Sequence, residues 1–137
     1  TGVWAAENTR AAIFDAFWNR RVFATTGLRP DLRFRVAGAF MGGEARCDGP
    51  PLVEALVRCD TPIEMVEIIR DGAVVHHVRG DRGDVAVRWT DEACPTGAHF
   101  YYTHVQFVGE EVSHPWNLAS ACGVHAWSSP VWVHLRS

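Results

Sequence analysis

The spacing of apolar residues changes once along this chain, and that change limits the possible folds more than any other feature. Residues 9–20 have the spacing of an amphipathic helix. Its apolar face carries Ile13, Phe14, Phe17 and Trp18. After the segment Arg20–Gly27, apolar residues recur at every second position, as half-buried strands require. We therefore expect one helix followed by a domain made of strands.

Turn signals divide the second part of the chain into short strands. Asp71-Gly72 is a typical hairpin turn, and residues 38–43 and 80–83 are rich in glycine. The strands are expected at residues 32–36, 52–59, 63–70, 73–78, 84–89, 98–108 and 124–135. Short strands without interleaved helices predict an antiparallel, immunoglobulin-like β-sandwich of about seven strands, preceded by the one helix.

Charge and hydropathy exclude two classes of partner. The chain has 13 arginines, no lysine and 16 acidic residues, and its net charge is −3. A nucleic-acid surface needs clustered positive charge, whereas these arginines are dispersed, so we expect no nucleic-acid partner. No apolar run approaches the roughly 20 residues that cross a bilayer, and no signal peptide is evident, so we expect a soluble chain without a membrane partner and assign no compartment.

The helix needs a surface to pack against, because an isolated helix of this length is marginal in water. The chain begins at Thr1 without methionine, and we expect it to be part of a longer protein. Three surfaces could cover the face formed by Ile13, Phe14, Phe17 and Trp18: the β domain, a missing upstream domain, or a second copy in a homodimer.

The histidines are the residues most suited to metal binding. His76 and His77 are consecutive on a predicted strand and point to opposite faces. If the end of the strand at residues 98–108 pairs with the start of the last strand, His99 lies near His134. This pair is the only candidate for two metal ligands, and it lacks a third. The alternative is that the imidazoles are held by local hydrogen bonds.

Catalytic and redox motifs are absent from the sequence. Ser128-Ser129-Pro130 has no nucleophile frame and is expected to be an edge or bulge in a strand. The acidic pairs Glu64/Glu67 and Glu110/Glu111 are read as solvated faces. The four cysteines have no C-x-x-C spacing, so we expect free thiols, with a Cys47–Cys59 bridge left open. We therefore assign no catalytic residue and no cofactor to this chain.

One loop has the composition of a binding surface. His114, Trp116 and Asn117 place an aromatic ring among polar groups, which suits stacking on a sugar or contact with a protein. The tryptophans in strand patterns, Trp89, Trp127 and Trp132, are expected in the core.

Several segments resemble the end of the catalytic domain, and the region after it, in PHP-type (polymerase and histidinol phosphatase-like) metallohydrolases of the carbaryl-hydrolase-like branch. The segments are Trp4–Arg10, Ala12–Ala16, Arg20–Gly27, Phe34–Val36, Phe40–Gly42, Thr61–Glu64, Val66–Gly72 and Ala126–Val133. The first and the last of them are the most specific.

The resemblance implies a division of labour within a longer protein. Residues 1–27 would be the closing strand, helix and strand of a PHP-type catalytic domain, and residues 28–137 an accessory β-sandwich. The metal site of that family includes an H-x-H motif and a later Asp-His pair, and neither matches a position here. The resemblance therefore implies a divalent metal in the upstream domain and hydrolysis of ester or phosphoester bonds there. The competing hypotheses are a carbohydrate- or protein-binding module and a dimerisation domain.

Overall fold

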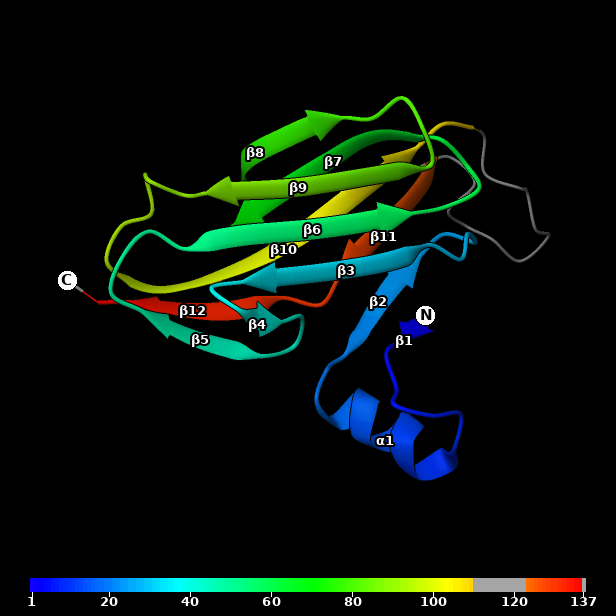
Figure 1. The fold of residues 1–137 in the computed structure, drawn as a ribbon, viewed down its shortest axis with the longest axis horizontal. Coiled ribbons are helices and arrows are strands. Elements are labelled where there is room, and N and C mark those ends of the chain that lie inside the picture. Colours follow the sequence, from blue (N-terminus) through cyan, green and yellow to red (C-terminus); the bar gives the residue numbers. More distant parts are fainter. Residues whose placement is uncertain (110–122, 137) are drawn as a thin grey trace.

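The described part of the chain is a two-layer β-sandwich with one helix, as the sequence predicts (Figure 1). The computed structural model describes residues 1–109 and 123–136. The predictions for Glu110, Glu111, the loop residues His114, Trp116 and Asn117, and Cys122 lie outside these residues. In the described part of the chain, no helix is long and apolar enough to cross a membrane.

The smaller sheet contains four antiparallel strands in the order β4-β3-β6-β9. They are β4 (Ala39–Phe40), β3 (Asp31–Val36), β6 (Leu52–Arg58) and β9 (Asp84–Thr90). Alternating residues of β3 and β6, among them Leu32, Phe34, Val53 and Val57, are fully buried. These residues form one wall of the core.

The larger sheet is arranged around β10 (Gly97–Phe107), which pairs along both edges. On one edge lie β7 (Ile63–Arg70) and then β8 (Ala73–Arg79). The other edge is shared end to end by β11 (Val124–Ser128) and β12 (Val131–Leu135). Beyond β11 lie β2 (Val22–Thr25) and β1 (Gly2–Val3), and beyond β12 lies β5 (Glu44–Cys47). The β12–β5 pair is parallel, and the other pairs between described strands are antiparallel.

The single strand expected at residues 124–135 is two strands. The chain leaves the ladder at Ser129-Pro130, where the bulge was predicted, because proline has no N–H to donate. His104 faces Trp127 before this interruption, and Tyr101 faces Val131 after it. The two halves are therefore out of register by one residue.

The inward face of β10 follows the predicted alternation. Tyr101, Thr103, Val105 and Phe107 are buried against the smaller sheet, which confirms this part of the pattern. The prediction that Trp132 lies in the core is wrong. Val131, Val133 and Leu135 point inward, so the residues between them point outward, and Trp132 is 37% exposed.

The segment before residue 28 contributes to the sandwich. Phe23 on β2 is part of the core, and the indole Nε1 of Trp4 donates a hydrogen bond to the carbonyl oxygen of Leu32 at 2.8 Å. The division at residue 27 stays a prediction about a longer protein. Within the described residues, the strands on its two sides belong to one sandwich.

Helix α1 (Arg10–Trp18) lies at one end of the sandwich, beside β1 and β2 (Figure 1). Thr9 caps it by accepting a hydrogen bond from the Ala12 amide at 3.3 Å. Ala16 is its one fully buried residue, whereas Phe14, Phe17 and Trp18 are 65%, 52% and 75% exposed. The apolar face thus does not fold back onto the sandwich, and that alternative is wrong.

The three described cysteines, Cys47, Cys59 and Cys94, are free thiols, as expected. The bridge left open between Cys47 and Cys59 is therefore not formed. Burial, the largest cause, raises the pKa of the Cys47 thiol above its ordinary value, so this thiol is a poor nucleophile at neutral pH.

Gly42 joins the helix end to the sandwich. Its amide donates to the Pro130 carbonyl oxygen at 2.8 Å, and its own carbonyl oxygen accepts from the Arg20 side chain at 2.9 Å. Its φ is +86°, and a Cβ added here would lie 2.4 Å from the Arg20 carbonyl oxygen. The position thus requires glycine for both its conformation and its space.

Gly38 provides a matched control for Gly42. It has a φ of +82° but no atom within 4 Å of an added Cβ. We expect Gly38→Ala to lower the free energy of unfolding by about 1–2 kcal/mol through backbone strain alone. Gly42→Ala should lower it by roughly 3 kcal/mol, because the backbone clash is added. Urea unfolding of both variants measures the difference, and equal losses would contradict this role of Gly42.

Candidate functional site

The outward residues of three adjacent strands form a groove on the larger sheet. Across β10, β12 and β5, one row is Phe100, Trp132 and Glu44, and the next is Ala98, His134 and Arg46. Since partners in a ladder share a face of the sheet, each row lies side by side on the outer surface. The small side chain of Ala98 leaves space between its larger neighbours.

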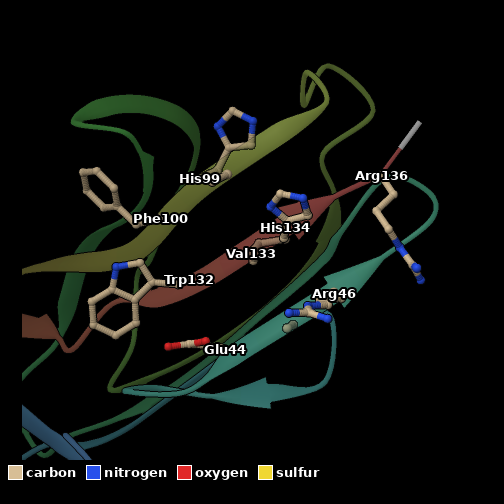
Figure 2. Close-up of a pocket in the computed structure, with 10 residues that line it drawn as sticks. Glu44, Arg46, His99, Phe100, Trp132, Val133, His134 and Arg136 are labelled. Carbon is tan, nitrogen blue, oxygen red and sulfur yellow. The ribbon is translucent and has the colours of Figure 1, made fainter.

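Figure 2 shows the polar and aromatic ends of this groove. Phe100, Trp132 and Glu44 lie toward one end, and His134, Arg46 and Arg136 toward the other. The groove has a volume of about 880 Å³. It combines exposed rings with charged groups, which is a composition suited to small-molecule recognition.

The charged residues of the groove differ in their partners. Arg136 forms an ion pair with Asp48, with 2.8 Å between Nε and Oδ1. In contrast, neither Glu44 nor Arg46 makes a side-chain hydrogen bond or ion pair with another described residue. Arg46 is therefore a cation that a ligand can reach without breaking an existing pair.

Trp132 is held in place from the side of the helix. The guanidinium of Arg20 lies 5.1 Å from the centre of the indole ring, and its Nε donates to the Gly42 carbonyl oxygen. This cation–π contact orients the ring while leaving a third of the residue exposed.

The candidate metal pair, His99 and His134, is not formed. The one-residue shift at Ser129-Pro130 places Ala98 opposite His134 and Val133 opposite His99, so the two imidazoles point to opposite faces. Among residues 1–109 and 123–136, no three His, Cys, Asp or Glu side chains are grouped to hold a metal ion.

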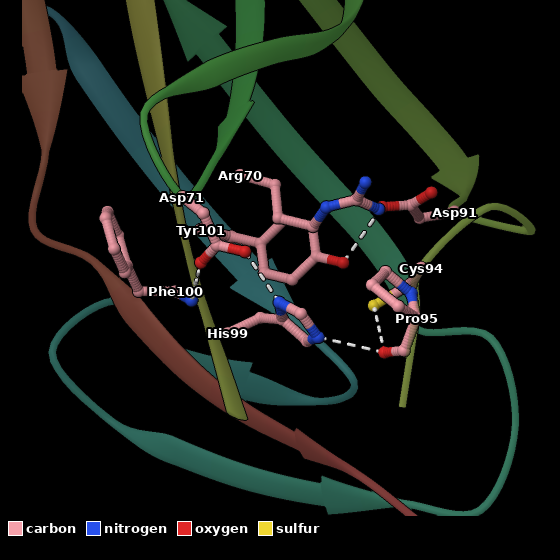
Figure 3. Close-up of polar contacts among 8 residues, drawn as sticks. All are labelled: Arg70, Asp71, Asp91, Cys94, Pro95, His99, Phe100 and Tyr101. Atoms are coloured by element: carbon pink, nitrogen blue, oxygen red, sulfur yellow. Dashed lines mark hydrogen bonds and ion pairs between the residues drawn. The ribbon is translucent and has the colours of Figure 1, made fainter. Parts of the chain in front are cut away.

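Both nitrogens of His99 are engaged elsewhere (Figure 3). Nδ1 lies 2.6 Å from Asp71 Oδ2, and Nε2 lies 2.9 Å from the Pro95 carbonyl oxygen. Both partners are acceptors, so each ring nitrogen that carries a proton donates to the oxygen beside it. His99 thus connects the β7–β8 turn to the loop before β10.

A buried ion pair lies next to His99 (Figure 3). Arg70 Nη1 lies 2.5 Å from Asp91 Oδ2, which also accepts a hydrogen bond from the Tyr101 hydroxyl at 2.9 Å. Burial, followed by the hydrogen bonds with Cys94 and Asp91, raises the pKa of Tyr101 far above its ordinary value. Tyr101 therefore remains a neutral donor, and this network is structural.

A second histidine cluster lies on the outer face of the larger sheet. His104 Nδ1 is 2.7 Å from Glu67 Oε2, and His104 Nε2 is 2.9 Å from His125 Nδ1. The Trp127 ring lies within 5.5 Å of both imidazoles. His104 Nδ1 donates to the Glu67 carboxylate, and the tautomers of the two rings decide which imidazole donates in the bond between His104 and His125.

This cluster was missed in the sequence, although the predicted hairpin contains it. Pairing the end of one strand with the start of the next places Phe107 opposite Val124, and His104 and His125 then share a face. No Ser or Cys side chain is hydrogen-bonded to His104 in the described part of the chain.

Comparisons with known proteins give relatives without a stated activity. Residues 1–62 match the family described as "Protein of unknown function (DUF3604)". Uncharacterized proteins of Chlamydia pneumoniae and Chlamydia muridarum are 28% and 26% identical over 99% of this chain, which aligns with 23% and 22% of their lengths. The chain thus spans about a quarter of these relatives. No solved structure matches it.

These similarities extend across both sides of residue 27. The family match runs from β1 into the segment before β7, and the Chlamydia relatives align along nearly the whole chain. The helix and the sandwich are therefore similar to one continuous region of a longer protein.

Asp91 and Asp48 allow a matched comparison of a buried and an exposed ion pair. The side chain of Asp91 is 1% exposed and that of Asp48 is 74% exposed. We expect Asp91→Ala to lower the free energy of unfolding by about 3–5 kcal/mol, because Arg70 is left without its partner. Asp48→Ala should cost less than about 1 kcal/mol. Chemical denaturation of both variants tests this, and similar losses would contradict the structural role of the Asp91 network.

The lowered pKa of Asp71 should make the stability of the fold depend on pH in the acid range. Burial acts to raise its pKa, but hydrogen bonds from His99 and the Phe100 amide outweigh burial and lower the pKa below the ordinary 3.8. A carboxylate with a lowered folded-state pKa stabilises the fold above its ordinary pKa, and this contribution is lost as pH falls through the folded-state value. We expect the difference in urea midpoint between the native protein and Asp71→Asn to shrink below pH of about 4. A difference that stays constant down to pH 2 would contradict this.

Proposed function

We propose that this chain is a non-catalytic β-sandwich region of a longer PHP-type, metal-dependent hydrolase, and that helix α1 docks it onto the rest of that protein. The observation that carries the proposal is the exposed apolar face of α1. Phe14 and Trp18 stack on each other with ring centres 6.2 Å apart, yet both rings are mostly exposed.

The shape of this face supports docking of a partner surface. Arg10, Ala11, Ile13, Phe14 and Phe17 line a depression of about 870 Å³ on the helix. A contiguous apolar patch of this kind is rare on a monomeric protein and marks an interaction surface. Since the Chlamydia relatives are about four times longer than the aligned region, the rest of the same polypeptide is the occupant we propose.

The hydrolase part of the proposal has separate support. It comes from the resemblance of Trp4–Arg10 and Arg20–Gly27 to the end of a PHP-type catalytic domain. In such a protein the upstream domain would hold the divalent metal, which activates water as the nucleophile for an ester or phosphoester. In the part of the chain that the structure describes, no group of His, Cys, Asp or Glu side chains is arranged to hold a metal ion.

Hydrolysis assays separate the roles of the two parts. The 137-residue chain should not hydrolyse p-nitrophenyl phosphate or p-nitrophenyl acetate with Mn²⁺ or Zn²⁺, because we assign the metal site to the upstream domain and no group of His, Cys, Asp or Glu within residues 1–109 and 123–136 is arranged to hold a metal ion. The longer polypeptide should hydrolyse at least one of these substrates and lose that activity with a chelator. Metal-dependent turnover by the 137 residues alone would overturn the non-catalytic assignment.

Hydrogen exchange tests the docking of α1. In the longer polypeptide, amides of Arg10–Trp18 should exchange at least tenfold more slowly than in the 137-residue chain, since packing stabilises the helix. The double variant Phe14→Ser/Phe17→Ser should remove this protection, whereas Val74→Ser, at an exposed position on β8, should not. Equal exchange in both forms would contradict docking. Protection in the 137-residue chain that rises with its concentration would instead identify a second copy as the occupant.

A further inference from the structure

The groove on the outer face of β10, β12 and β5 is a second candidate binding surface, separate from helix α1. Its exposed rings are Phe100 and Trp132, which are 38% and 37% exposed on neighbouring strands. Rings of this size are usually buried, so a pair of them on the outer face of a sheet indicates a surface for a ligand.

The polar groups beside these rings lie on the edge strand. Glu44 and Arg46 are both exposed on β5, in register with Trp132 and His134. Glu44 can accept hydrogen bonds from hydroxyl groups, and the guanidinium of Arg46 can donate two parallel bonds to a carboxylate or sulfate. The groove therefore offers a ring platform, an acceptor and an anion-binding donor within two rows of one sheet.

The charge of the groove favours an anionic ligand. The chain as a whole has a net charge of −3, but the groove contains Arg46 and Arg136 against the single acid Glu44. Because Arg136 is paired with Asp48, Arg46 is the cation whose charge is not balanced by a described neighbour. An acid group on the ligand would complete this pair.

The groove is organised before a ligand binds. The Cα positions of both rows are fixed by the β10–β12–β5 ladder, and the Trp132 ring is oriented by Arg20. Few side chains need to become ordered on binding, which lowers its entropic cost.

We propose that this groove binds an acidic saccharide, with a sugar ring stacked on Trp132 and its acid group on Arg46. A pyranose has an apolar C–H face that can cover an indole and hydroxyl groups that can reach Glu44. A partner helix fits less well, because charged side chains interrupt the apolar surface. A nucleic acid would need several unpaired cations, and the groove has one such arginine.

Calorimetric titration of the 137-residue chain with defined saccharides tests the site. The probes are a four-residue oligogalacturonate, a heparin tetrasaccharide, and the oligogalacturonate with its carboxylates reduced to alcohols. We expect saturable binding of at least one acidic probe, at least tenfold weaker binding of the reduced probe, and weaker binding of the acidic probe as salt rises. No saturable binding of either acidic probe would overturn the proposal.

Matched variants locate the binding site. Trp132→Ala should weaken binding of the acidic probe at least tenfold, and Trp132→Phe should weaken it less because a ring remains. Arg46→Gln should weaken binding of the acidic probe but not that of the reduced probe. Trp18→Ala and Arg88→Gln replace exposed residues away from the groove and should leave the affinity unchanged.

Two results would contradict this location. One is an unchanged affinity in Trp132→Ala whose circular dichroism and thermal midpoint match those of the native protein. The other is a loss in the Trp18 or Arg88 control equal to the loss in the groove variants, which would indicate non-specific attraction. Because helix α1 takes no part in the groove's ligand contacts, the docking proposal can fail without affecting this one.

Discussion

The pairing of β10 along both of its edges is the constraint on which the larger sheet depends. Its eleven residues hold β7 on one side and both β11 and β12 on the other. The inward residues of β10 supply Tyr101, Val105 and Phe107 to the core. Its outward residues supply Phe100 to the groove and His104 to the histidine cluster. The strand β10 therefore supplies residues both to the core that stabilises the sandwich and to the polar sites on its surface.

Alternation of apolar residues was enough to predict the layers of the fold, because burial on one face of a strand imposes a period of two. It was not enough to predict the register of the last strand. The interruption at Ser129-Pro130 was expected, but the one-residue shift that it introduces depends on how the chain rejoins the ladder. That shift separates His99 from His134. His104 and His125 lie before the interruption, so the predicted hairpin was sufficient to place them on one face, and this inference was missed.

The helix shows a different limit of sequence patterns. The spacing of Phe14, Phe17 and Trp18 predicted a helix and its apolar face, but a pattern does not specify what covers that face. Ala16 is the one helix residue that is fully buried, whereas Phe23 on β2 belongs to the core of the sandwich. The large rings remain outside. The position of the helix is decided by tertiary packing and not by its amphipathic character.

Arg20 connects the helix to the groove. It follows Asn19, the C-cap of α1, and its backbone has a positive φ of 57°, which is uncommon for a residue with a Cβ. The surrounding contacts hold this conformation: its amide bonds to Phe17, its side chain bonds to Gly42, and its guanidinium stacks on Trp132. The same residue thus ends the helix that we propose as a docking surface and orients the ring that we propose as a saccharide platform. Arg20 is thus a direct packing link between the end of α1 and the indole of Trp132.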